Sequence, residues 1–273
     1  MPFTSIENND IKIHIKKKTR MDQPIDSPYY KGKGKQKKLI TPNPLPNVLP
    51  NQSFLWILSG PPRSGKSTYI ESLLSSPDYK GKRQSYRGLF NRIIFVTPQI
   101  SDFENDAFNE LEDVYSELTL EVLEEIESIA QKEYDNGEQC LIVFDDMGSK
   151  MRESVKIQKK LENLCFNHRH MNCSVFFCVQ TYVSLSPGMR KSCRLLTLFA
   201  MDTMSERDMI FNDLPIKKDE HDELYKYVFD NKTDNEKRDK SGRKMKHTLF
   251  IDKSKLRRPQ ISLYKNFDLI EMK

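Results

Sequence analysis

The sequence has no hydrophobic run long enough to cross a membrane, and it has no internal repeat. Its longest apolar stretches, such as residues 195–201, are far shorter than the roughly 20 residues that a transmembrane helix needs. Residues 1–20 are polar and basic, which does not fit the apolar segment of a secretory signal. We therefore expect a soluble protein that has no membrane span and is not secreted.

Cysteine is scarce as well. The chain has five cysteines, an odd number that cannot all pair with one another. They lie in or beside apolar segments, which favours a reducing compartment over disulfide formation. These residues are Cys140, Cys165, Cys173, Cys178 and Cys193.

Charge is distributed unevenly along the 273 residues, whose net charge is +5. Residues 12–38 hold ten Lys or Arg against two Asp, and residues 41–50 hold four prolines. Such a segment buries too little apolar surface to offset its chain entropy, so residues 1–50 are predicted to be a flexible basic arm. A second basic stretch spans residues 232–258, and residues 102–138 are acidic. The basic stretches are either solvated charge or polycationic arms that neutralise nucleic-acid phosphates.

Apolar runs alternate with helical patterns through the middle of the chain. Five continuous apolar runs are typical of strands buried on both faces. They span residues 54–58, 92–97, 140–144, 174–179 and 195–201. Apolar residues at helical spacing indicate helices over 119–134 and 154–166. This order predicts an α/β fold with a mainly parallel sheet, followed by a helix over 217–230 and a strand pair at 248–251 and 260–264.

The most informative motif follows the first of these strands. Residues 60–68 read Gly-Pro-Pro-Arg-Ser-Gly-Lys-Ser-Thr, which matches G-x-x-x-x-G-K-[ST] between a strand and a helix. The backbone N–H groups of such a loop surround a phosphate chain at the N-terminus of the helix. Lys66 is expected to reach the β- and γ-phosphates, and Ser67 is expected to bind Mg²⁺. The predicted nucleotide-binding residues are Gly60, Pro61, Pro62, Arg63, Ser64, Gly65, Lys66, Ser67 and Thr68.

Further polar groups stand at the ends of two later strands. Asp145 and Asp146 follow an apolar run, and in a P-loop fold such an acid holds Mg²⁺, so Asp145 is the predicted metal ligand. Asp146 would then orient and deprotonate the attacking water. Gln180 directly follows the strand at 174–179, at the edge where such sheets carry ligands, and is predicted to sense the γ-phosphate.

The order of these motifs resembles one family. The loop at 60–68, the strand that ends in two aspartates, an Arg-His turn at 167–172, the Gln-Thr strand and a Pro-x-x-Arg at 187–190 look like the genome-packaging ATPases of large eukaryotic DNA viruses. The prototype is the poxvirus packaging ATPase, of the FtsK–HerA superfamily of P-loop motors. The resemblance covers residues 54–202 and is weaker around 250–252. Many relatives carry Glu where Asp146 stands, and the basic arm has no counterpart in the family.

This resemblance implies a RecA-like (ASCE) P-loop core and an ATP-hydrolysing translocase that packages a double-stranded DNA genome. The cofactors would be ATP and Mg²⁺. The partners would be double-stranded DNA, further copies of the chain in a ring, and a capsid or portal-vertex protein. The setting would be the virion or a reducing viral factory of the host cell. The composition of the chain predicts the arm over 1–50, and we expect an ATPase core over 51–215 and a helix-and-strand extension over 216–273 packed on the core.

Ring motors of this kind complete each active site with an arginine from the adjacent subunit, which stabilises the transferring phosphoryl group. Arg190 matches the Pro-x-x-Arg position of the family and is the predicted catalytic arginine. Arg169 and Arg194 are the other candidates, and each of the three is as well suited to a surface ion pair.

Two other functions compete with packaging. A P-loop helicase or DNA-repair NTPase would share the phosphate loop, but it usually carries further motifs and a second motor domain, for which this chain has little room. A nucleotide-binding tether between DNA and capsid would not hydrolyse ATP, and it would have no need of the water-positioning Asp146 and Gln180.

The spacing around residue 168 brings a second kind of metal site into consideration, namely a zinc site. Four residues of zinc-ligand type lie close together, namely Cys165, His168, His170 and Cys173. A single residue separates the histidines, which is shorter than the usual spacer, and Cys165 falls on the apolar face of a helix. A buried structural cysteine is therefore favoured over a zinc ligand.

Overall fold

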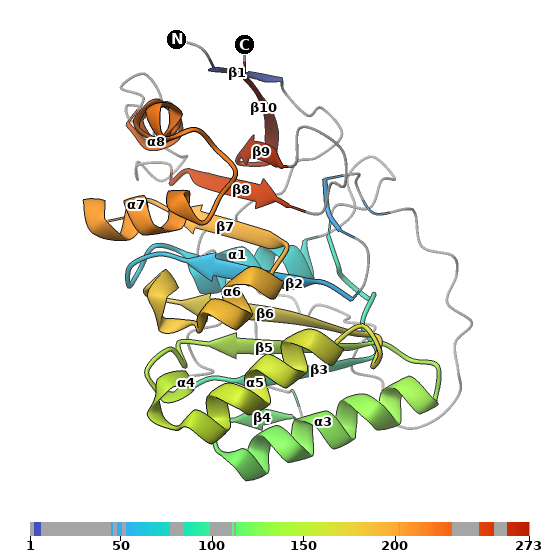
Figure 1. Cartoon of the computed structure of the whole chain (residues 1–273). Coiled ribbons are helices and arrows are strands. Elements are labelled where there is room, and N and C mark those ends of the chain that lie inside the picture. Colours follow the sequence, from blue (N-terminus) through green and yellow to red (C-terminus); the bar gives the residue numbers. More distant parts are fainter. Residues whose placement is uncertain are drawn as a thin grey trace.

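A computed structural model of the protein describes residues 3–6, 45, 48–50, 53–76, 85–98, 111, 113–201, 203–230, 246–253 and 261–272. In this part of the chain, ten strands form one sheet (Figure 1). The strands are β1 (Phe3–Ile6), β2 (Leu55–Ser59), β3 (Arg92–Val96), β4 (Val114–Tyr115), β5 (Cys140–Asp145), β6 (Cys173–Val179), β7 (Leu195–Phe199), β8 (Thr248–Asp252), β9 (Ser262–Lys265) and β10 (Asp268–Met272). Their spatial order is β1-β10-β9-β8-β7-β2-β6-β5-β3-β4.

Helices cover both faces of this sheet. They are α1 (Lys66–Ser75), α3 (Leu120–Asp135), α4 (Lys150–Glu153), α5 (Val155–Asn167), α6 (Pro187–Ser192), α7 (Met204–Asn212) and α8 (His221–Phe229), with 3₁₀ turns η3 (Tyr182–Ser184) and η4 (Lys218–Glu220). In Figure 1, α1 lies behind the sheet, and α3, α5 and α6 lie in front of it. None of the helices in the described ranges is both long and apolar enough to span a bilayer.

The sheet has a parallel part and an antiparallel part. The neighbouring strands β7, β2, β6, β5, β3 and β4 run parallel, whereas β8, β9, β10 and β1 extend the β7 edge in antiparallel order. The predicted α/β P-loop fold with a mainly parallel core is confirmed. Strand β6 lies between β2 and β5, so the carboxyl ends of these three strands meet at one edge, where open parallel sheets bind ligands.

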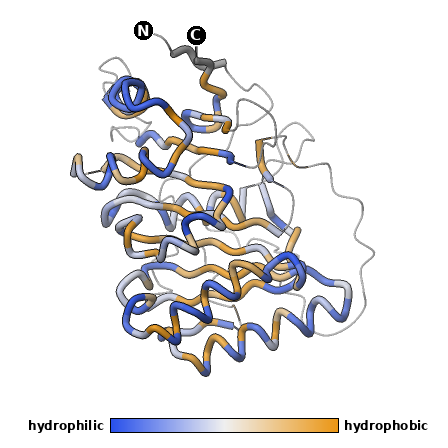
Figure 2. Tube along the Cα trace, in the orientation of Figure 1, coloured by the Kyte–Doolittle hydropathy of each residue, from blue (hydrophilic) through white to orange (hydrophobic). Residues whose placement is uncertain are grey.

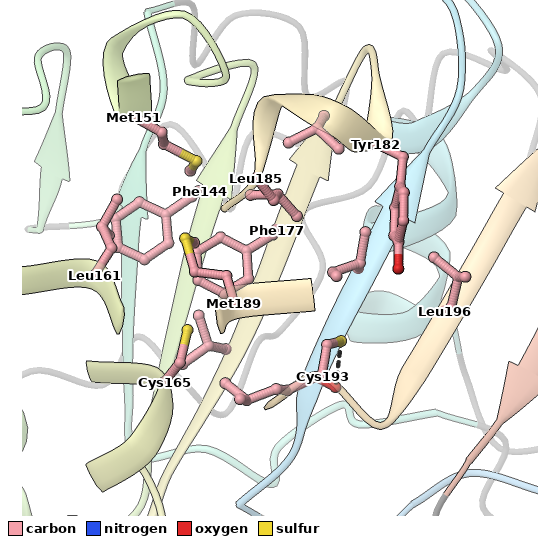
Figure 3. Close-up of a cluster of buried hydrophobic side chains, with 14 of the residues drawn as sticks. Phe144, Met151, Leu161, Cys165, Phe177, Tyr182, Leu185, Met189, Cys193 and Leu196 are labelled. Carbon is pink, nitrogen blue, oxygen red and sulfur yellow. Dashed lines mark hydrogen bonds between the residues drawn. The ribbon is translucent and has the colours of Figure 1, made fainter. Parts of the chain in front are cut away.

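Two apolar layers hold the sheet between the helices. Side chains alternate across each strand, so Leu55 and Ile57 of β2 pack with α3, α5 and α6, while Trp56 and Leu58 pack with α1. Figure 2 shows the pattern in the sequence, with mainly hydrophobic central strands and with hydrophilic and hydrophobic residues alternating along α3 and α5. The larger layer includes the residues drawn in Figure 3, where Phe144 and Phe177 stack with ring centroids 5.2 Å apart.

Two parts of the predicted basic arm pack on the rest of the described chain. Residues 3–6 pair with β10 as β1, whereas we expected a flexible arm over all of 1–50. Val48 and Leu49 are buried in the α1 layer, and Leu45 packs against it partly exposed. Residues 7–44 lie outside the described ranges, as do 232–245 and 254–258 of the second basic stretch.

Candidate nucleotide-binding site

The phosphate-binding loop runs from the end of β2 to the start of α1, as the motif predicts. Its first glycine lies against β7, since a Cβ on Gly60 would come within 2.6 Å of the Cβ of Phe199. The backbone then turns through two left-handed positions, Arg63 with φ of 61° and Gly65 with φ of 104°. These turns return the chain over the N-terminus of α1, whose first turn contains no acidic residue to compete with a bound anion.

Lys66 is the buried cation of this loop. Its Nζ donates to the carbonyl oxygens of Gly60 at 2.7 Å and Pro61 at 3.0 Å, so the ammonium lies across the loop. Burial lowers the pKa of Lys66, and the carboxylates of Asp145 and Asp146 oppose that shift. A positive charge with only partial compensation from its own chain is suited to an anionic ligand such as a phosphate.

Ser67 and Asp145 meet at the end of β5. The Ser67 hydroxyl donates to Oδ2 of Asp145 at 3.3 Å, and the Asp145 residue is only 4% exposed. Both groups are hard oxygen donors of the kind that Mg²⁺ prefers. Cys178 of β6 stands in register with Asp145. Burial raises the pKa of the Cys178 thiol well above its usual range, and the Asp145 carboxylate raises it further, so this cysteine is a neutral neighbour of the carboxylate.

Asp146 and Gln180 form a second, exposed pair beside the first. Asp146 leaves β5 in a left-handed conformation with φ of 54°, and its N–H donates to the carbonyl of Cys178 at 3.1 Å. Gln180 directly follows β6, and its Nε2 donates to Oδ1 of Asp146 at 2.6 Å. The positive φ turns the Asp146 side chain away from the buried strand and toward solvent. The structure therefore brings the predicted base and the predicted sensor into direct contact.

Sequence patterns did not indicate a lysine that reaches the loop from the C-terminal extension. Lys246 precedes β8, and its Nζ donates to the carbonyl oxygen of Arg63. Its side chain also passes Gly65, because an added Cβ at that glycine would lie 3.9 Å from Lys246 Cδ. No local signal identifies this contact, which joins residues 183 positions apart. Cys178 was likewise overlooked, since only the strand register places it beside Asp145.

The three candidate arginines lie apart from this cluster. Arg190 of α6 is held within its own chain by Asp213, with Nε 3.4 Å from Oδ2, and by the ring of Tyr182, whose centroid is 5.2 Å from the guanidinium carbon. Its side chain is 15% exposed. Arg169 and Arg194 are exposed, Arg169 in the turn before β6 and Arg194 directly before β7. They therefore lie at the amino-terminal edge of the parallel sheet, opposite the phosphate loop.

The four residues of zinc-ligand type do not converge. Both ring nitrogens of His168 face carbonyl oxygens, Nδ1 at 2.7 Å from Cys165 and Nε2 at 3.0 Å from Ser53. Burial lowers the pKa of His168, although these two carbonyls oppose the shift. His170 is exposed, and no group of three or more metal-ligating side chains occurs within the ranges that the structure covers. His168 instead joins the end of α5 to the segment before β2.

The chain matches one protein family and resembles several solved structures. The family described as Poxvirus A32 protein matches residues 46–255. No curated protein matches the chain. Among solved structures, the DNA-packaging ATPase B204 from Sulfolobus Turreted Icosahedral Virus shares 15% identity, with 79% of this chain and 98% of that chain covered and a TM-score of 0.52. This likeness shows a common fold.

Two further solved structures are similar at lower scores. The genome packaging NTPase B204 from Sulfolobus turreted icosahedral virus 2, in complex with ATP-gammaS, shares 14% identity over 77% of this chain and 96% of that chain, with a TM-score of 0.48. EssC (ATPases 2 and 3) from Geobacillus thermodenitrificans shares 12% identity over 60% of this chain and 35% of that chain, with a TM-score of 0.45.

Proposed function

The chain belongs to the poxvirus A32 protein family, and we propose that it is an ATP-hydrolysing motor that moves double-stranded DNA into a viral capsid. Family membership confirms the resemblance to viral genome-packaging ATPases that the motifs indicate. The observation that carries the proposal is the convergence of two contacts at one sheet edge. Ser67 meets Asp145 beside the phosphate loop, and Asp146 meets Gln180 next to them.

ATP binding rests on the loop and on Lys66. The N–H groups at the start of α1 and the Lys66 ammonium together provide the positive potential that a triphosphate requires. Lys66 need only exchange the carbonyls of Gly60 and Pro61 for phosphate oxygens, which are stronger acceptors because they are charged.

The donor set at the end of β5 fits Mg²⁺. Ser67 Oγ and Asp145 Oδ2 are neighbouring oxygen atoms, and they would hold the ion together with phosphate oxygens and water. When bound, Mg²⁺ neutralises charge on the phosphates. A test is Asp145→Asn, which should raise the Mg²⁺ concentration needed for half-maximal ATPase activity.

Asp146 and Gln180 are the groups suited to the attacking water. The Asp146 carboxylate is exposed and keeps Oδ2 for a water molecule while Oδ1 accepts from Gln180. The Gln180 amide fixes the plane of the carboxylate, and its carbonyl oxygen is an acceptor for the same water. This arrangement suits a general base and favours hydrolysis over a nucleotide-binding tether without turnover.

DNA, a ring and a capsid protein complete the proposal. The name of B204 describes a DNA-packaging ATPase of similar fold, and the basic stretches at 12–38 and 232–258 supply charge for phosphates. In a ring, an arginine of the adjacent subunit would complete each site, with Arg190 as the residue that matches the family motif. We place the motor in the virion or the viral factory of the host cell.

DNA-stimulated hydrolysis is the decisive measurement. The purified protein should hydrolyse ATP in the presence of Mg²⁺, and linear double-stranded DNA should raise the rate. Lys66→Ala should bind the same DNA, because Lys66 lies inside the nucleotide loop, yet lose turnover. Hydrolysis that double-stranded DNA leaves unchanged would argue for another P-loop NTPase. Near-wild-type turnover by folded Lys66→Ala would overturn the site itself.

A further inference from the structure

The contact between Lys246 and the phosphate loop is not used by any role described above. Lys246 is exposed, but its ammonium faces the Arg63 carbonyl instead of open solvent. Arg63 is the first of the two left-handed residues that shape the loop. A cation on its carbonyl stabilises the peptide orientation that turns the next N–H groups toward the interior of the loop.

A hairpin turn fixes Lys246 in this place. The side-chain Oδ1 of Asn266 accepts from the N–H of Thr248 at 2.8 Å, and the N–H of Asn266 donates to the Thr248 carbonyl at 3.0 Å. The Asn266 Nδ2 also lies 2.8 Å from Nδ1 of His247. These contacts hold the two residues that follow Lys246, so its backbone is positioned by the end of β8.

Charge adds a second reason. The ammonium groups of Lys246 and Lys66 both lie on carbonyl oxygens of this loop, Lys246 on that of Arg63 and Lys66 on those of Gly60 and Pro61. Two cations beside the same loop repel each other, which costs free energy when no nucleotide is bound. An anion placed between them removes that cost. A triphosphate on the N-terminus of α1 is such an anion.

We propose that Lys246 is a second cation of the nucleotide site, a positioning residue that holds the Arg63 peptide and strengthens binding of the phosphate chain. The inference rests on the proposed ATPase function and deepens it, because it assigns part of the nucleotide affinity to the C-terminal extension. The contribution is to binding, so it acts on substrate and transition state alike.

The test compares nucleotide affinities of full-length variants by titration with a non-hydrolysable ATP analogue, ADP and AMP. Lys246→Ala should weaken binding of the ATP analogue by about tenfold, which is the size expected for one charge-assisted contact. The loss should shrink from the ATP analogue to ADP and to AMP, because the negative charge near the loop decreases. In steady-state assays KM should rise while kcat stays within about twofold.

Two variants serve as controls. Lys253→Ala removes the same charge just beyond the other end of β8, at the sheet edge away from the loop, and should bind as the wild type does. Lys246→Gln keeps a donor for the Arg63 carbonyl without the charge, and its affinity should fall between those of Lys246→Ala and the wild type. Thermal melts check that each variant is folded.

The outcomes separate this inference from the ATPase function. If Lys66→Ala abolishes nucleotide binding but Lys246→Ala binds as tightly as the wild type, the role of Lys246 is overturned and the ATPase function stands. Equal losses in Lys246→Ala and Lys253→Ala would also overturn it, because the effect would then be one of net charge. Absence of nucleotide binding in the wild type would overturn both.

Discussion

Asp146→Asn tests the assignment of the base without disturbing the fold. Asparagine has the shape of aspartate, and its carbonyl oxygen can still accept from Gln180, which lies 2.6 Å from Oδ1 in the native pair. Asp146 has φ of 54°, a conformation that asparagine adopts more readily than other non-glycine residues. The residue is exposed, so little packing changes. We expect the free energy of unfolding to change by no more than about 0.5 kcal/mol.

Catalysis should respond far more strongly than stability. A positioned general base contributes typically about 10²- to 10⁴-fold, which corresponds to about 3 to 5 kcal/mol in the barrier. The amide that Asp146→Asn introduces cannot take the proton of the attacking water, so kcat should fall by that factor while binding of ATP and Mg²⁺ persists. Asp146→Ala should lose similar activity and, unlike Asp146→Asn, about 1 kcal/mol of stability because alanine disfavours the left-handed conformation.

The assay combines single-turnover hydrolysis, nucleotide titration and thermal melts on both variants. Asp145→Asn is the matched comparison, since Asp145 is buried against Ser67 and should affect Mg²⁺ binding instead. If Asp145→Asn abolished turnover at saturating Mg²⁺ while Asp146→Asn impaired only metal binding, the two roles would be reversed. Unchanged kcat in both variants would refute the interpretation of the β5 terminus as a catalytic element.

Two other predictions concern charged groups outside this pair. Arg190→Ala should bind ATP without turnover and should regain activity when it is mixed with Lys66→Ala subunits. The control is Asp213→Asn, which removes the charge that pairs with Arg190 in its own chain and should stay active. No recovery in rings shown to mix would exclude Arg190. Burial and the neighbouring Glu138 raise the pKa of Glu133 from 4.5 to about 7, so the folded state binds this proton more tightly than the unfolded state. The free energy of unfolding should therefore fall by about 1 kcal/mol, after allowance for solvent screening, as pH rises from 4.5 to about 7. Thermal melts of Glu133→Gln should lack this pH dependence.

The parallel core was predictable because its strands are buried on both faces. Continuous apolar runs are enough to predict such strands, and the five runs in the sequence correspond to β2, β3, β5, β6 and β7. Two short helices were missed although local signals were present. Thr203 caps α7, with Glu206 three residues on as in a capping box, and Ser186 caps α6 with Pro187 in its first turn.

The hairpin between β9 and β10 could not be predicted in the same way. Its two-residue turn consists of Asn266 and Phe267, both with positive φ, where an Asn-Gly pair would have been the usual signal. Phenylalanine disfavours this conformation, and the tertiary structure offsets the cost. The Phe267 ring is buried and stacks on Tyr69 of α1 at a centroid distance of 5.7 Å. Packing between distant segments has overridden the local preference.

The same division applies to the candidate site. The loop and the strand ends were found because each is a contiguous motif whose chemistry is set by residue type and order. Cys178 and Lys246 belong to the site only through strand register and through a hairpin that closes far from the loop in sequence. Contacts of that kind leave no periodicity or spacing in the sequence, so they had to come from the structure.

The turn of this hairpin supports the nucleotide site in two ways, directly at helix α1 and through Lys246 at the phosphate loop. Phe267 packs on Tyr69, which lies one turn after Lys66 in α1, and Asn266 holds the residues that place Lys246 against Arg63. The β8–β10 strands continue the core sheet through β7, whose Phe199 abuts Gly60 at the start of the loop. A displacement of these strands would therefore change the loop at its beginning, its middle and its helix. The C-terminal extension therefore supports the nucleotide site, and an ATPase core that ended near residue 215 would retain the motifs while losing these contacts.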